Sequence, residues 1–132
     1  MEEKNGISCE IKGMISYNAP TDMTLSEGGG PIEDLLGTDD VENVPDLAES
    51  ASCSTYISNE RNIPPILMFH AIRDEVVSIE HSRSLYAKLK LHDKEVEYYE
   101  LENEGHRCPA FWGNDILDIV EEFINRNSKF VE

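Results

Sequence analysis

Asp74 and His106 each have a side chain suited to proton transfer and each follow a predicted strand in the 132-residue chain. Asp74 follows an apolar run, residues 66–69, and His106 follows a run rich in strand-forming residues, 96–101. A carboxylate that accepts a hydrogen bond from one imidazole nitrogen fixes the tautomer and orientation of the ring. The other nitrogen can then take a proton from a nucleophile, so the pair predicts acid and base work in nucleophilic catalysis.

The elements that must position this pair are those of an α/β sheet. Two prolines precede the apolar run at 66–69, and a polar turn and a helical pattern follow it, which predicts a buried parallel strand. Residues 96–101 are expected to form the neighbouring strand. Open α/β sheets carry their chemistry at the carboxyl ends of the strands. We therefore expect Asp74 and His106 to converge at one rim of a shared sheet.

Three further elements complete the expected framework. A strand is predicted at 11–17, ended by Asn18-Ala19-Pro20. Helical spacing over 79–91 predicts a helix whose buried face contains Ile79, Ser82, Leu85, Tyr86 and Leu89. His81 lies off that face and is expected to be exposed to solvent. Residues 115–126 predict a second helix, capped by Asn114, whose inward face contains Ile116, Ile119, Val120, Phe123 and Ile124.

The segment between the first two strands is expected to contribute packing rather than chemistry. The glycines at 28–30 are not followed by Gly-Lys-Ser/Thr, and Pro31 stands where a helix amide would be needed, so a flexible loop is favoured over a phosphate loop. Short helices are predicted before Gly37 and over 44–54. Asp22 is expected to cap a local turn rather than to belong to a site.

Residues 63–126 resemble the C-terminal part of an α/β-hydrolase of the prolyl-oligopeptidase-like and small-ester (acetyl or feruloyl) esterase group. The segments that carry the resemblance are His70-Ala71, Asp74, Val76-Val77-Ser78 and Gly105-His106, in an order that matches the Ser…Asp…His order of the group. Residues 11–22 are similar to the strand and loop that follow the nucleophile helix in that group. Ala71 and Ser78 depart from the glycine and the proline of the family pattern.

This resemblance implies the C-terminal portion of an α/β-hydrolase sheet, with about three mainly parallel strands and flanking helices. One partial domain would span residues 1–132: a strand and loop at 11–22, an excursion with short helices at 23–63, and the acid and histidine strands with the terminal helix at 64–132. The resemblance also implies a serine hydrolase that cleaves esters or peptides through an acyl-enzyme. Asp74 would be the orienting acid, and His106 the general base and then the general acid.

The nucleophile of that mechanism does not appear in the sequence. A nucleophile elbow places its serine in Gly-x-Ser-x-Gly, and the nearest run, Gly6-Ile7-Ser8-Cys9-Glu10, has Glu10 in place of the second glycine. The chain alone is therefore expected to form no acyl-enzyme. Cys108, two residues after His106, is expected to be a non-catalytic thiol. A non-catalytic remnant or interaction module, which binds a partner through an open sheet edge, is the alternative function.

Composition excludes several classes of partner. A formal net charge of -16, from 27 acidic and 11 basic residues, argues against nucleic acid and anionic membrane surfaces. The histidines and the 3 cysteines show no metal-ligand or disulfide spacing, so no cofactor or metal is expected. The expected partners are a small ester or peptide substrate and a second copy of the chain at the open edge. A reducing cytoplasm is the default compartment, and secretion stays open because a preceding segment could carry a signal.

Overall fold

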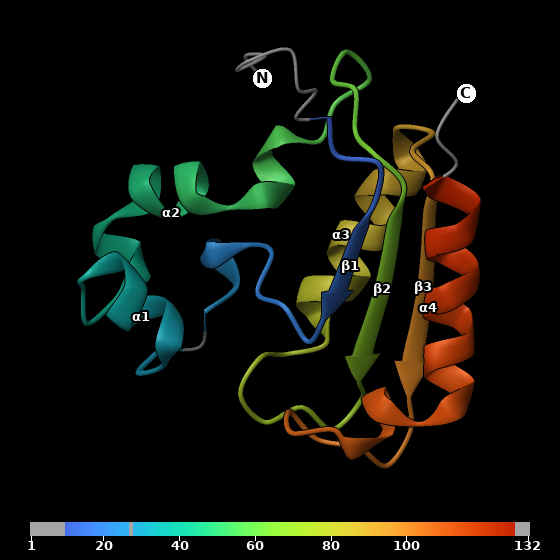
Figure 1. The fold of residues 1–132 in the computed structure, drawn as a ribbon. Helices are drawn as coiled ribbons and strands as arrows, with labels where there is room; N and C mark the ends of the chain where they lie inside the picture. The colour runs from blue at the N-terminus through green and yellow to red at the C-terminus, as the bar shows by residue number, and fades with distance from the viewer. Residues whose placement is uncertain (1–9, 27, 129–132) are drawn as a thin grey trace, which may run out of the picture.

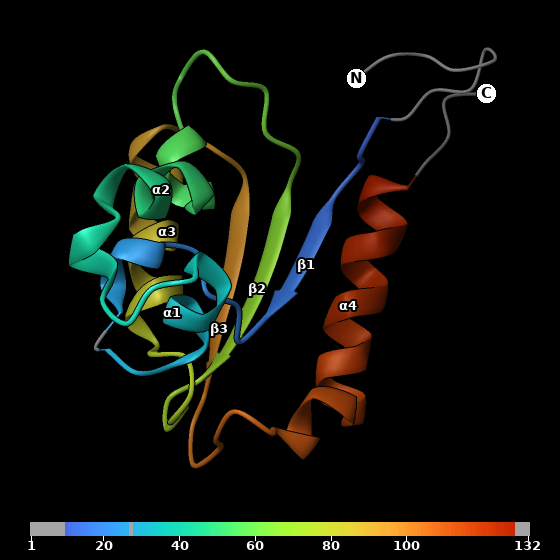
Figure 2. The same ribbon diagram turned by 90° about the vertical axis from the view of Figure 1, so that its left-hand side faces the viewer.

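A computed structural model describes residues 10–26 and 28–128 of the chain. Its centre is a sheet of three strands, β1 (Met14–Tyr17), β2 (Ile66–Ala71) and β3 (Val96–Leu101), which lie in the order β1-β2-β3 with both pairings parallel. Helix α3 (Glu80–Leu91) covers one face of the sheet, and α4 (Asn114–Asn127) covers the other (Figures 1 and 2). The predicted α/β arrangement, about three mainly parallel strands with flanking helices, is confirmed.

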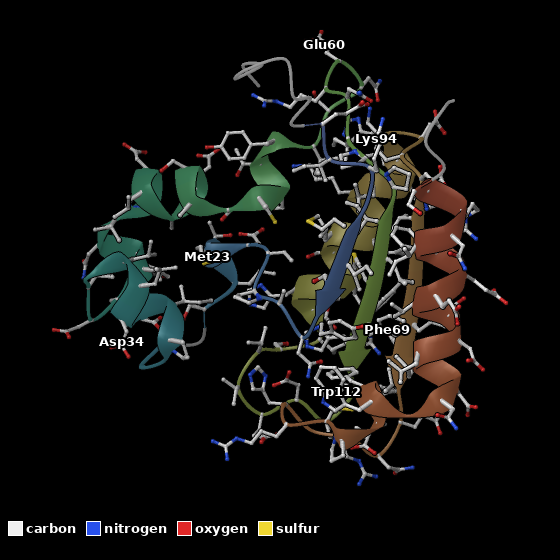
Figure 3. The ribbon with its side chains drawn as sticks, viewed as in Figure 1. Met23, Asp34, Glu60, Phe69, Lys94 and Trp112 are labelled. Atoms are coloured by element: carbon white, nitrogen blue, oxygen red, sulfur yellow. The ribbon has the colours of Figure 1, made fainter. Side chains whose placement is uncertain are left out.

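Strand β2 is the centre of the core because it is buried on both faces. Every residue from Ile66 to Ala71 is buried, as expected for a central parallel strand. Alternate residues point to opposite faces. Leu67, Phe69 and Ala71 pack with residues of α4 and of the 3-10 helix η4 (Pro109–Trp112), whereas Ile66 and Met68 pack with α3 (Figure 3).

The excursion between β1 and β2 forms a small core of its own. Its elements are η1 (Met23–Leu25), α1 (Pro31–Leu36), η2 (Val41–Asn43), α2 (Pro45–Ala51) and η3 (Cys53–Tyr56). Four of its side chains are buried together, those of Met23, Leu36, Val41 and Ala48. The predicted short helices are present, each beginning at a proline, and Gly37 ends α1 in the left-handed region with φ +68°. This layer stands beside the sheet near β1 (Figure 1).

Two predictions about the terminal helix are wrong. Gly113, not Asn114, is the N-cap of α4, and Asn114 is its first residue. Ile124 is 47% exposed, although Phe123 beside it is buried. Ile124 lines a surface cavity together with Gly13 and Ile15, near β1 at the edge of the sheet. Among the described residues, no further strand covers that edge. The apolar face of α4 is therefore wider than the sheet beneath it, and its outer side is left in solvent.

Strand β1 is shorter than the predicted strand at 11–17, because its pairing with β2 covers only Met14–Tyr17. Its other edge pairs with no strand among the described residues. Within residues 10–26 and 28–128, no helix has both the length and the apolar character needed to cross a bilayer.

Candidate active site

The ends of β2 and β3 bring two loops together at one rim of the sheet. Leu101 is the register partner of Ala71, so the chain leaves both strands at the same height. Two backbone hydrogen bonds then join the loops, from Ile72 N–H to the carbonyl of Leu101 and from Arg73 N–H to the carbonyl of Glu104, both at 3.0 Å. This backbone pairing places the residues that follow, Asp74 and His106, side by side.

The Asp74 carboxylate and the His106 imidazole meet directly. The distance from His106 Nδ1 to Asp74 Oδ2 is 2.8 Å. The Asp74 side chain is fully buried, and the His106 side chain is 33% exposed. A carboxylate oxygen only accepts hydrogen bonds, so Nδ1 carries the proton and Nε2 keeps its lone pair. No described residue hydrogen-bonds Nε2, which is therefore free to act as a base.

Two backbone donors also bind the Asp74 carboxylate, and the ring of His70 lies near it. Asp74 Oδ1 accepts from the backbone N–H groups of Val76, at 2.9 Å, and Val77, at 2.8 Å. Its Oδ2 lies 3.4 Å from Nε2 of His70, a residue of β2 with no exposed surface. A buried carboxylate is costly unless donors replace the lost water, and the two N–H groups replace it. They also fix the rotamer from which Asp74 orients His106.

His70 is itself held on both ring nitrogens. Its Nε2 donates to the carbonyl of Val77 at 2.9 Å, which leaves Nδ1 to accept from the hydroxyl of Ser82, on α3, at 2.7 Å. The ring therefore links β2, α3 and the Asp74 loop. Sequence reasoning used His70 only as part of a motif, although a lone polar residue within a buried apolar strand was a usable signal.

The two departures from the family pattern are structurally mild. Ala71 is the last residue of β2 and is not among the described residues with positive φ, so the site does not require a glycine there. The Ser78 hydroxyl accepts from Glu80 N–H at 3.3 Å, at the start of α3. The N-cap of α3 is Ile79, which gives no side-chain cap, so the Ser78 hydroxyl acts one residue before the cap position.

His81 contradicts the sequence prediction, because it is 2% exposed rather than solvated. Its Nδ1 accepts from the backbone N–H groups of Thr21, at 3.2 Å, and Asp22, at 3.3 Å. Helical spacing identified the face of α3 that meets the sheet. It carried no information about the loop after β1, which covers a second face of the same helix.

Stability should depend on pH through His81. Burial lowers the pKa of His81 and His70 adds to that, while Asp22 and Asp74 act in the opposite direction. The unfolded chain takes up a proton near the ordinary pKa of about 6.5, and the folded chain only at lower pH. The contribution of the neutral His81 ring to the free energy of unfolding is therefore fully present above about pH 6.5. It declines as the pH falls below that value, by at most about 1.4 kcal/mol per pH unit.

Urea unfolding at pH 7.5, 6.5 and 5.5 measures this slope. His81→Asn is the matched control, because the amide oxygen of asparagine can accept from Thr21 and Asp22 N–H without titrating. The variant should show a flatter slope than the wild-type chain between pH 6.5 and 5.5. Equal slopes in the two proteins would contradict the assignment to His81.

A cavity of about 540 Å³ lies beside Asp74, between the start of α1 and the loop after β2. Its lining includes Pro31, Ile32, Ile72, Val76, Ile79 and His81, and no Lys or Arg side chain among the described residues. Glu33 also lines it, and its carboxylate accepts from the hydroxyl of Ser26 and from Gly30 N–H. These two hydrogen bonds lower the pKa of Glu33 and fasten the glycine loop to α1. Gly28, Gly29 and Gly30 also line this cavity.

The remaining candidate residues lie in settings of other kinds. Burial raises the pKa of the Cys108 thiol, which favours the protonated, weakly nucleophilic form. Asp22 accepts from Thr24 N–H at 3.0 Å, the local turn cap that the sequence predicts. Residues 6–9 of the run nearest to an elbow lie outside the described residues. Within the described ranges, no group of three or more His, Cys, Asp or Glu is placed to hold a metal ion.

Comparison with known proteins supplies a family and a fold. The BD-FAE family model matches residues 1–89, a range that includes Asp74 and ends before His106. No curated protein matches the sequence.

Among solved structures, the chain is similar to a truncated form of a carbohydrate esterase from gut microbiota, at TM-score 0.77 and 19% identity over 94% of this chain and 45% of that one. It is also similar to a propionate-bound esterase of Thermogutta terrifontis, with a TM-score of 0.63 and 20% sequence identity. That match covers 95% of this chain and 46% of the esterase. A third similar structure is a puromycin-hydrolyzing peptidase of Mycobacterium tuberculosis, with a TM-score of 0.60 and 19% sequence identity. That match covers 73% of this chain and 15% of the peptidase. The chain thus has an α/β-hydrolase fold and spans less than half the length of these relatives.

Proposed function

Because this chain belongs to the BD-FAE family, we propose that it provides the acid and base of a serine hydrolase that cleaves esters or peptides through an acyl-enzyme. One observation supports this role above the others. The buried Asp74 carboxylate binds Nδ1 of a partly exposed His106, 2.8 Å away, and leaves Nε2 without a partner among the described residues. That is the arrangement in which an imidazole activates a hydroxyl.

The proposed mechanism assigns each step to an atom of this chain. His106 Nε2 takes the proton of a serine hydroxyl while the serine oxygen bonds to the acyl carbon, and then gives that proton to the leaving alcohol or amine. Water repeats the sequence and releases the acid. Asp74 stabilises the imidazolium, and the Val76 and Val77 N–H groups keep Asp74 in place. The serine and the oxyanion donors would come from outside these 132 residues, so we expect the isolated chain to be inactive.

The proposed substrate is a small ester or peptide. Two of the similar structures are named as esterases and one as a peptidase, so the relatives include both kinds of bond. The cavity beside Asp74 offers apolar and polar lining and, among the described residues, no cationic side chain. Together with the net charge of -16, this supports a preference for uncharged over anionic substrates.

A non-catalytic role as an interaction module is the second candidate, and the free edge of β1 favours it. Met14 and Tyr17 of this strand are 45% and 37% exposed, and Ile11 before it is 57% exposed. An apolar edge strand pairs readily with another chain. In this case the chain would associate with itself or a partner through β1, and Asp74 and His106 would serve no turnover.

Labelling with a fluorophosphonate probe separates the two candidates. The isolated chain should not be labelled. The chain joined to an upstream half that contains Gly-x-Ser-x-Gly should be labelled, and His106→Ala should slow that labelling by about a hundredfold or more. Labelling of the isolated chain would contradict a missing nucleophile. A folded, completed protein that stays unlabelled would favour the interaction module.

A further inference from the structure

Asn18, in the turn after β1, is held in a conformation that few residues adopt. Its φ is +45°, and it is 4% exposed. Asparagine is among the few non-glycine residues that tolerate this left-handed region. Its backbone N–H donates to the carbonyl of Phe69 at 3.0 Å, which extends the pairing of β1 with β2 by one residue. A buried polar side chain is therefore fixed at the rim of the sheet where the proposed active site lies.

Both ends of the Asn18 amide are used. Oδ1 accepts from Ala71 N–H, at the end of β2, at 2.8 Å. Nδ2 donates to the backbone carbonyl of His106 at 2.9 Å. One side chain thus spans from the strand that leads to Asp74 to the backbone of the residue that carries the imidazole. Ala71 and His106 lie 53 and 88 positions from Asn18 along the chain.

The backbone of His106 has little other support. Its N–H donates to the carboxylate of Glu75, an exposed residue, over a long 3.4 Å. Before it in the loop, Glu104 accepts from Arg73 N–H. The contact with Asn18 is the shorter of the two hydrogen bonds that the structure gives to the His106 backbone, and it comes from a buried group. A hydrogen bond that is partly shielded from water is electrostatically stronger than one in bulk solvent.

We propose that Asn18 is a positioning residue that sets the height of the His106 imidazole against Asp74. The amide fixes the His106 carbonyl, the carbonyl fixes the Cα, and the ring then reaches Asp74 Oδ2 with Nδ1 protonated. Its importance for turnover rests on the proposed function, whereas the positioning itself is a property of this chain. Asparagine suits the task because one side chain donates and accepts while tolerating positive φ.

The test observes the His106 ring by nuclear magnetic resonance in the whole isolated chain, where no turnover is needed. Asn18→Gly keeps the positive φ and removes both amide contacts. We expect the His106 Nδ1 proton to exchange with water at least tenfold faster than in the wild-type chain. We also expect the ¹⁵N shifts to show a lower fraction of the Nδ1-protonated tautomer. Unchanged exchange and an unchanged tautomer fraction in a folded Asn18→Gly chain would overturn the proposal.

Two further variants keep the result decisive. Asn18→Asp retains an acceptor for Ala71 N–H but loses the donor to His106, so it should also speed exchange of the Nδ1 proton even if Asn18→Gly fails to fold. Leu89→Ala, a core change on the α3 face of the sheet, controls for general loss of stability and should leave the His106 proton as in the wild type. Faster exchange of that proton in Leu89→Ala, matching the Asn18 variants, would overturn the proposal. The outcome is independent of fluorophosphonate labelling, so failure of either idea is recognised separately.

Discussion

Replacing Asp74 by asparagine is expected to lower kcat by about 10⁴-fold in a hydrolase completed by an upstream half, with a much smaller change in KM. The amide can still accept from Val76 and Val77 N–H through its oxygen. Its nitrogen would then face His106 Nδ1 and donate to it, which forces the ring into the tautomer that carries its proton on Nε2. A protonated Nε2 cannot take the proton of the serine. The measurement is steady-state hydrolysis of a chromogenic ester.

The matched control for this variant is Asp22→Asn. Asp22 follows β1 as Asp74 follows β2, but it caps a turn through Thr24 N–H, a bond that an amide oxygen can also accept. It should leave kcat within about twofold. The expected tautomer change can also be observed without turnover, as a protonated Nε2 in the ¹⁵N spectrum of the isolated Asp74→Asn chain. A kcat equal to that of the Asp22 control would remove Asp74 from the mechanism.

Replacing Phe69 by alanine is expected to lower the free energy of unfolding by about 3–5 kcal/mol, which is a large share of the ~5–15 kcal/mol that holds a typical domain folded. Phe69 is fully buried in β2. Its ring stacks against Tyr17 at 5.3 Å and Tyr99 at 5.5 Å, so it links all three strands on the α4 face. Removing it leaves a cavity and ends both stacks. Urea unfolding, followed by circular dichroism, gives the loss.

Phe69→Leu serves as the comparison, because leucine keeps most of the apolar volume and should cost clearly less than alanine. Tyr56→Ala is a second control, since Tyr56 is 43% exposed and lies outside the sheet. A loss below about 1 kcal/mol for Phe69→Ala would mean that the core rearranges around the gap. Phe69 would then not be a principal source of the stability of the sheet.

Much of the framework could be predicted from residues near one another in sequence. An apolar run predicts the strand at Ile66–Ala71, helical spacing predicts the helix at Glu80–Leu91, and strand-forming residues predict the strand at Val96–Leu101. The structure has all three. A loop after each parallel strand then suffices to place Asp74 and His106 on the same rim. Their distance of 2.8 Å required the register of β2 with β3, which is set by pairing between residues about thirty positions apart.

Residue patterns along the chain were enough to predict the types and order of the main elements, because propensity and periodicity are local properties of the chain. Only the tertiary structure decided what covers each element from outside. It buried His81 under the loop after β1, exposed Ile124 at the sheet edge, and brought Asn18 against the His106 backbone. The physical reason is that burial and side-chain hydrogen bonding depend on segments far apart in sequence, whose approach no local pattern encodes.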